Sequence, residues 1–206
     1  MRESSRMEVI VVRHTETQNN VVRVIQGQSD SPLTENGINL AVESFQFFKG
    51  KPIDRIISSP IDRAYKTASI LCKTIGASTR RIIRNEGLKE IDLGKWTNKP
   101  IDELTKDHGA NSYYYYKNHP QLFKPEEGES LFDLQNRVRT CFDRLVDKYR
   151  RFGRIVIVSH SVAIRVLLLS LENRSMEDVW TYRLPPASKT IIELENNKVN
   201  LSQIGF

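Results

Sequence analysis

Two short runs of apolar, β-branched residues, each ending at a histidine, constrain the fold of this chain more than any other feature. Residues 9–12 lead directly into Arg13 and His14, and residues 155–158 lead into Ser159 and His160. Uninterrupted apolar runs of this kind are typical of strands buried on both faces, as in parallel sheets. Ligands of open parallel sheets bind just beyond the carboxyl ends of the strands. Both histidines are therefore predicted to lie at a ligand-binding edge.

Predicted strands and helices alternate along most of the chain. Strands are expected at 7–12, 53–58, 78–84 and 154–159, with two closing strands at 188–195 and 198–203. Helical periodicity predicts helices after Thr34, after Ser59 and over 130–150 and 162–171. We expect Ser59 to cap its helix and Pro60 to occupy the first turn. This order predicts an α/β fold, a three-layer α/β/α sandwich with a mostly parallel central sheet.

The first of these helices should bury an apolar stripe of Ile38, Ala41, Val42, Phe45 and Phe48. The long loop at 15–33 is expected to be functional.

The 206 residues are predicted to form a single domain, 1–206, with an irregular excursion at about 100–129. Four consecutive tyrosines at 113–116 interrupt that excursion, and they either form a lid or cover a hydrophobic surface. His108 and His119 flank these tyrosines and are expected to be exposed.

A formal net charge of +6 allows nucleic-acid or membrane binding, or an anion site on a soluble protein. The basic residues are scattered, and no polybasic run or RNA-binding signature occurs. No apolar run reaches the length of a membrane span, and the first residues do not resemble a secretion signal. Cys72 and Cys141 both fall within helical patterns. We expect them to be core residues of a protein that is kept in a reducing compartment. We expect a cytoplasmic monomer or homodimer without nucleic-acid or membrane partners.

Three predicted strand ends bring together His14, His160, Arg13 and, just beyond Ser58 and Ser59, Arg63. Guanidinium groups suit a tetrahedral oxyanion, and helix N-termini add backbone donors for an anion. A neutral imidazole is a nucleophile that can attack phosphorus. A poor alkoxide leaving group then requires a general acid, for which Glu86 and Glu90 are the candidates. A metal site built from the histidines and carboxylates is disfavoured because HxxxH and CxxC spacings are absent.

In several segments the chain resembles the histidine phosphatase superfamily, in the branch of cofactor-dependent phosphoglycerate mutases and related phosphatases. The segments are Arg13-His14-Thr15-Glu16-Thr17 with Asn20, Ile25-Gln26-Gly27 with Asp30 and Pro32-Leu33-Thr34, Ser58-Ser59-Pro60 with Arg63-Ala64 and Thr67-Ala68, Leu88-Lys89-Glu90 with Gly94 and Trp96, Gly128-Glu129-Ser130, and Val158-Ser159-His160. Their order along the chain makes the resemblance specific.

The resemblance implies a role for each matching residue. His14 would be the phosphorylated nucleophile, and Glu90 rather than Glu86 would be the proton donor. The remaining catalytic positions, which would hold the phosphoryl group, are Arg13, Arg63 and His160. Phosphate or substrate would also contact Thr15, Thr17, Asn20, Gln26, Gly27 and Ser161. The resemblance implies no metal and no organic cofactor.

Two residues depart from the family pattern, because Thr15 and Ser161 replace glycines that follow the two histidines. Glycine lets backbone approach a ligand closely. Thr15 would therefore narrow the pocket or donate its hydroxyl to the phosphate. We also expect His14 to be neutral for attack and His160 to be protonated.

The predicted function is hydrolysis of small phosphorylated metabolites, phosphomonoesters, through a phosphohistidine intermediate. A phosphoglycerate mutase is the alternative, although this chain lacks the extra length with which such mutases enclose their intermediate. A catalytically weak phosphate-binding protein is the second alternative, motivated by Thr15 and Ser161.

Overall fold

The computed structural model describes residues 6–106, 109, 112–196 and 198–206. A six-stranded sheet runs through its centre in the order β3-β2-β4-β1-β5-β6. The strands are β1 (Met7–Arg13), β2 (Arg55–Ser58), β3 (Ile82–Arg84), β4 (Arg154–Ser159), β5 (Lys189–Glu195) and β6 (Lys198–Gln203). The first four in this order are parallel, whereas β5 and β6 are antiparallel to their neighbours.

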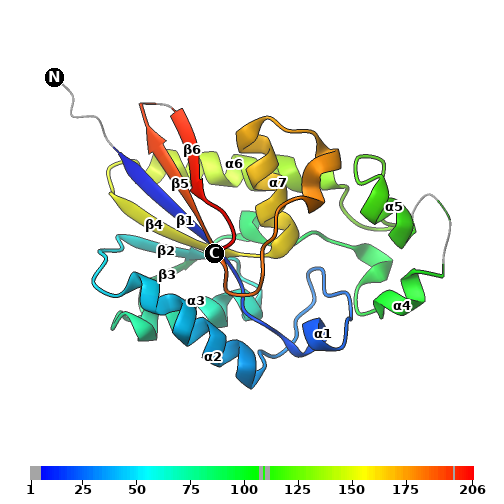
Figure 1. Ribbon diagram of the computed structural model, residues 1–206, viewed down its shortest axis with the longest axis horizontal. Coiled ribbons are helices and arrows are strands. Elements are labelled where there is room, and N and C mark those ends of the chain that lie inside the picture. Colours follow the sequence, from blue (N-terminus) through cyan, green and yellow to red (C-terminus); the bar gives the residue numbers. More distant parts are fainter. Residues whose placement is uncertain (1–5, 107–108, 110–111, 197) are drawn as a thin grey trace.

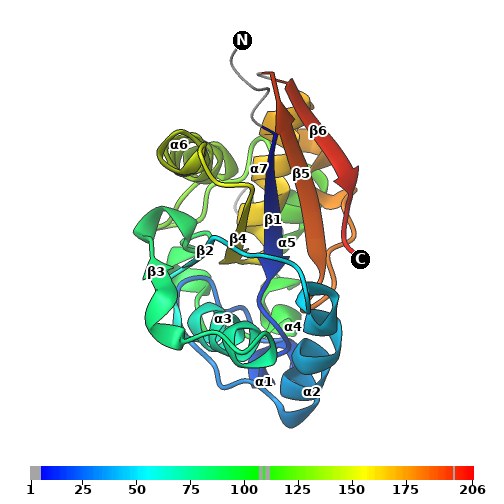
Figure 2. The ribbon, with the colours of Figure 1, turned by 90° about the vertical axis from the view of Figure 1, so that its left-hand side faces the viewer.

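Helices cover both faces of the sheet (Figures 1 and 2). One face carries α2 (Glu35–Ser44) and α3 (Asp62–Thr74), and the other carries α6 (Leu131–Tyr149) and α7 (Ser161–Glu172). Side chains of β1 alternate between two apolar cores, since Val9 and Val11 join the α6/α7 side and Ile10 and Val12 join the α2/α3 side. The predicted three-layer sandwich with a mostly parallel sheet is confirmed.

The buried face of α2 differs from the predicted stripe. Ile38 and Val42 are each 42% exposed, whereas Ala41, Phe45 and Phe48 are fully buried. Gly37 explains why α2 buries a different face from the predicted one, because a Cβ at this position would lie only 2.4 Å from the carbonyl oxygen of Glu16. The close approach of that backbone turns the Gly37 side of α2 inward. The helix ends at Ser44, and a 3-10 turn, η1 (Phe45–Phe48), follows.

The helix predicted to begin at Ser59 begins instead at Asp62. Its N-terminal backbone groups bond to a side chain from another segment: the Asp30 carboxylate accepts from the N–H groups of Asp62 at 2.6 Å and Arg63 at 3.2 Å. Ser59 does not cap this helix; its hydroxyl lies 2.8 Å from the Nε2 atom of His160. A contact between distant segments, rather than a side chain next to the helix in sequence, therefore caps the start of α3.

Short elements occupy the predicted loop and excursion. The loop at 15–33 contains α1 (Gln18–Val21), and the excursion contains α4 (Ile101–Leu104) and α5 (Tyr113–Asn118). The tyrosines belong to α5, where Tyr116 is buried against Trp96, Phe123 and Trp180. His119 is half-buried rather than exposed, and His108 lies outside the described residues. Further 3-10 turns are η2 (Thr79–Arg81), η3 (Glu86–Leu88), η4 (Gly94–Trp96) and η5 (Met176–Trp180).

The carboxyl ends of β1, β2 and β4 lie side by side, because Arg13 pairs with Ser159 and Ser58 with Val158. This register brings the residues after three strands to one edge of the sheet. Among the described residues, no helix is long and apolar enough to cross a membrane.

Candidate active site

A cavity of about 390 Å³ opens at this edge of the sheet. Five cationic residues line it, namely Arg13, Arg23, Arg63, Lys117 and Arg165, and Glu90 is the one carboxylate among its described lining residues. This excess of positive charge in a partly enclosed space favours an anionic ligand.

His14 lies at the inner end of the site and is 3% exposed. Its Nδ1 atom is 2.7 Å from the carbonyl oxygen of Thr15, which can only accept, so Nδ1 carries the proton. Its Nε2 atom accepts a hydrogen bond of 3.3 Å from Nε of Arg63. The imidazole therefore presents a lone pair on Nε2 toward a guanidinium group, as a nucleophile for an anionic phosphoryl group requires.

Burial and positive neighbours keep both histidines neutral. Desolvation, followed by the charge of Arg63, holds the pKa of His14 well below its usual value of 6.5. Desolvation and Arg63 likewise hold the pKa of His160 well below 6.5. The expectation of a neutral His14 agrees with this environment. The expectation of a protonated His160 does not, because four positive or protonatable neighbours oppose a second charge there.

His160 lies beside His14 with their ring centroids 5.2 Å apart, although it is not among the cavity-lining residues. Its ring is fully buried, and its Nδ1 atom has no hydrogen-bond partner. The buried Nε atom of Arg13 also has no partner, while its Nη1 donates to the Leu184 carbonyl. Buried polar atoms are rarely left unsatisfied. These two atoms mark the place where a ligand would supply partners.

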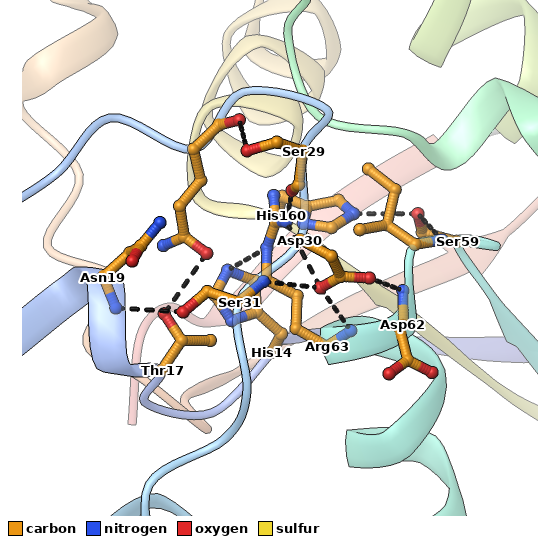
Figure 3. A network of polar contacts seen from close by, with 12 residues as sticks. His14, Thr17, Asn19, Ser29, Asp30, Ser31, Ser59, Asp62, Arg63 and His160 are labelled. Atoms are coloured by element: carbon orange, nitrogen blue, oxygen red, sulfur yellow. Dashed lines mark hydrogen bonds and ion pairs between the residues drawn. The ribbon is translucent and has the colours of Figure 1, made fainter. Parts of the chain in front are cut away.

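Arg63 is 2% exposed and is held by the loop that precedes α2 (Figure 3). Its Nη1 donates to the carbonyl of Ser29 at 2.5 Å, and its Nη2 donates to the carbonyl of Gly27 at 2.7 Å. Asp30 holds the backbone of the same residue through its N–H. The loop therefore fixes both ends of Arg63 while Nε faces His14.

Glu90 lines the cavity and is anchored at the start of α7. Its Oε1 accepts from the backbone N–H groups of Ile91 and Ala163, each at 3.0 Å, and its Oε2 accepts from Val162 at 3.1 Å. Oε2 has the greater spare capacity for a ligand proton. Glu86, the rival candidate, forms a surface ion pair with Lys89 and does not line the cavity.

The predicted phosphate- or substrate-binding residues divide into two groups. The cavity is lined by Asn20, Gln26, Gly27 and Ser161. Thr15 and Thr17 are fully buried and absent from that lining. Thr15 donates its hydroxyl to the carbonyl of Gly37 at 2.6 Å, so it neither narrows the pocket nor faces it. Thr17 caps α1, and its hydroxyl contacts Asn20 and Gln26.

The sequence reasoning missed the outer cavity wall. This wall includes Arg23, Tyr113, Lys117, Arg165 and Trp180. Arg165 lies one helical turn beyond Ser161 on α7, a spacing from which its proximity to the site was predictable. The others come from the turn after α1, from α5 and from η5, whose packing no local pattern reveals.

Another missed residue, Arg137, supports the segment that carries Glu90. It pairs with Glu129 at 2.7 Å and donates to the carbonyls of Gly87, Lys89 and Glu90. Within the described part of the chain, no group of three or more histidine, cysteine, aspartate or glutamate residues is arranged to hold a metal ion.

A sequence profile of the histidine phosphatase superfamily (branch 1) matches residues 9–206. The chain belongs to this superfamily. Among its relatives, a probable phosphoglycerate mutase, GpmB, of Yersinia pestis is 34% identical over 165 residues, which cover 80% of this chain and 74% of that protein. The superfamily resemblance inferred from the motifs is therefore confirmed.

Solved structures of the superfamily share the whole fold. YhfR of Bacillus stearothermophilus superposes with a TM-score of 0.88 at 28% identity, covering 97% of this chain and 96% of that chain. The alpha-ribazole phosphatase of Shigella flexneri superposes with a TM-score of 0.86 at 25% identity, with the same coverage. Since histidine phosphatases and their mutase relatives are enzymes, the chain is an enzyme of this phosphatase and phosphoglycerate mutase group.

Proposed function

We propose that this histidine phosphatase hydrolyses small phosphomonoesters through a phosphohistidine formed on His14. The observation that carries the proposal is the state of the His14 imidazole. It is neutral, its Nδ1 proton is fixed on the carbonyl of Thr15, and its Nε2 lone pair faces the guanidinium of Arg63. A nucleophile held in this way loses little orientational freedom on attack.

In the first step, Nε2 of His14 attacks phosphorus, the N–P bond forms, and the bond from phosphorus to the ester oxygen breaks. Arg13 and Arg63 contribute positive charge to the phosphoryl oxygens. The partnerless Nε of Arg13 and Nδ1 of His160 are the atoms left to interact with them. Glu90, entering as the carboxylic acid, gives its proton to the leaving alkoxide.

In the second step, the Glu90 carboxylate takes a proton from water, and the water oxygen attacks phosphorus. The N–P bond breaks and His14 returns to its neutral form, while Glu90 is again protonated. Asn20, Gln26 and Gly27 border the substrate in this proposal, since all three line the cavity. Thr15 and Thr17 contribute indirectly in this proposal, through hydrogen bonds to the Gly37 backbone and to the side chains of Asn20 and Gln26.

A phosphoglycerate mutase is the second candidate, because the relative from Yersinia pestis bears that name. A mutase returns the phosphoryl group to substrate, whereas a phosphatase gives it to water. The cavity of this chain is partly open, which favours water as the acceptor.

The test uses purified protein with 32P-labelled ester, and with 3-phosphoglycerate and p-nitrophenyl phosphate as separate substrates. We expect an acid-labile 32P adduct on the wild type and none on His14→Ala. Release of phosphate should fall by about 10⁴-fold or more in that variant. His119→Ala, which changes a histidine outside the site, is the matched control and should retain both properties.

Rapid isomerisation of 3-phosphoglycerate with negligible phosphate release would establish the mutase instead. A wild type that no ester labels, but that still binds phosphate, would be a phosphate-binding protein.

A further inference from the structure

A turn at 184–188, between η5 and β5, is bonded to the end of β1 on which the site is built (Figure 1). The carbonyl of Leu184 accepts from Nη1 of Arg13 at 2.5 Å, and the carbonyl of Ser188 accepts from the backbone N–H of Arg13 at 3.0 Å. Both the side chain and the backbone of this arginine are therefore held by one short segment that does not itself line the cavity.

This turn contains an unfavourable backbone conformation. Ala187 has a φ of 58°, in the left-handed region that alanine rarely adopts. Its N–H donates to the carbonyl of His14 at 3.4 Å, and its side chain is buried. Strained conformations of this kind persist only where the surrounding structure imposes them. A contact from outside the turn is therefore required to hold it.

Ser44, the last residue of α2, supplies that contact. Its hydroxyl donates to the carbonyl of Ala187 at 2.9 Å and accepts from Nζ of Lys189 at 2.7 Å. Because an ammonium group can only donate, the single hydroxyl proton of Ser44 is directed at Ala187. The three residues form one hydrogen-bonded chain with a fixed direction, which begins at Lys189 and ends on the turn.

Lys189, the first residue of β5, is buried at 5% exposure. Its Nζ lies 3.4 Å from the backbone carbonyl oxygen of Ser44, and 4.9 Å and 5.6 Å from the ring centroids of Phe206 and Phe47. Lysine is almost never fully buried unless its charge has partners. A charged donor strengthens the hydrogen bond that it makes, and successive bonds in a chain polarise one another. The buried ammonium therefore strengthens the hold of Ser44 on the turn.

We propose that Ser44 and Lys189 are positioning residues for Arg13. Through the turn at 184–188 they fix the guanidinium that the proposed mechanism places against the phosphoryl oxygens, so this inference rests on the proposed function. Both act on the reaction only through Arg13. The two ends of α2 then serve the two arginines of the site, since the loop before α2 holds Arg63 and the last residue of α2 holds the turn.

The test begins with Ser44→Ala, which removes the hydroxyl and leaves the backbone carbonyl of this residue for Lys189. We expect kcat/KM for p-nitrophenyl phosphate to fall by about tenfold, because a displaced guanidinium stabilises the transition state less well. Ser44→Thr keeps a hydroxyl and should recover most of the activity. Lys189→Met leaves the hydroxyl without its charged donor and should give a smaller loss.

A double-mutant cycle separates positioning from a general loss of stability. In the Arg13→Met background, Ser44→Ala should lower kcat/KM by less than about twofold, because the group through which it acts is gone. A variant that is only less well folded loses activity by the same factor in both backgrounds. An equal loss in the two backgrounds would therefore overturn the inference.

Ser170→Ala is the matched control, because it also removes a hydroxyl that donates to a backbone carbonyl, that of Leu167 on α7 at 2.7 Å. It should keep the wild-type kcat/KM. A loss in this control as large as that in Ser44→Ala would count against a specific role for the hydroxyl of Ser44.

A binding measurement distinguishes this inference from the proposed hydrolysis. Calorimetry with inorganic phosphate should show weaker binding in Ser44→Ala than in the wild type, and no further weakening when Ser44→Ala is added to Arg13→Met. If this pattern is found but the wild type releases no phosphate from any ester, the positioning role stands and the proposed hydrolysis fails. If esters are hydrolysed but Ser44→Ala lowers neither kcat/KM nor phosphate affinity, the positioning role is refuted.

Discussion

At the scale of single residues, His14 and His160 illustrate how burial sets chemistry. Both imidazoles are buried near guanidinium groups, and desolvation, followed by repulsion from Arg63, holds their pKa values below 6.5. In the proposed mechanism, a neutral His14 attacks without first losing a proton. The consequence for stability is that the folded protein leaves these histidines neutral at a pH where the unfolded chain protonates them.

This exclusion predicts that the protein loses stability in mild acid. Below about pH 6.5 the unfolded histidines bind protons while the folded ones stay neutral, so the free energy of unfolding should fall as the pH falls from 7 to 5.5. Each histidine should contribute up to about 1.4 kcal/mol per pH unit. Urea denaturation at a series of pH values measures this slope, and His160→Gln should reduce it. A free energy that stays constant over this range would show that the folded histidines titrate normally.

At the scale of elements, the loop before α2 and the helix α3 behave as one unit. Asp30 accepts from the first backbone N–H groups of α3, and the carbonyls of Gly27 and Ser29 hold the side chain of Arg63 on its first turn. The loop thus both caps the helix and positions its arginine. A helix N-terminus also favours an acidic group there through the helix dipole.

Asp30→Ala should therefore affect stability and catalysis together. Loss of the cap should lower the free energy of unfolding by about 1 kcal/mol. Displacement of Arg63 should lower kcat/KM for any phosphomonoester by about tenfold to a hundredfold. Asp30→Asn keeps an accepting oxygen and should recover most of the stability, as thermal denaturation would show. Asp62→Ala changes a neighbouring exposed carboxylate and serves as the control; an equal effect there would remove the special role of Asp30.

Much of this element structure was predictable from sequence, and the exceptions share a cause. Strands β1 and β4 and their terminal histidines follow from local β-branched runs, and α6 follows from its apolar periodicity. The start of α3, the rotation of α2 and the buried hydroxyl of Thr15 depend on partners far along the chain, namely Asp30, Glu16 and Gly37. The outer cavity wall was not predictable for the same reason, because α5, α7 and η5 meet there only after folding.

At the scale of the whole molecule, the cavity concentrates positive charge at one edge of the sheet. Binding an anion there should stabilise the folded protein, since the unfolded chain has no such site. At a free phosphate or orthovanadate concentration of about 100 times its Kd, the gain should be about 2.7 kcal/mol, which raises Tm by roughly 5–10 °C for a chain of this length. Thermal shift measurements at constant ionic strength test this. Arg63→Met should lose most of the increase, and an unchanged response in that variant would place the bound anion elsewhere.

The register of β1 also has a consequence for biosynthesis. Its two neighbours in the sheet are β4 and β5, so that Val9 pairs with Ile155 on one side and Ile192 on the other. A ribosome adding about 5–20 residues per second completes the intervening segment only after roughly 7–30 s. During that interval this largely buried, apolar strand leaves the ribosome with neither partner made. Early chaperone contact with residues 7–13 is the expected way for a cell to protect this strand until β4 arrives.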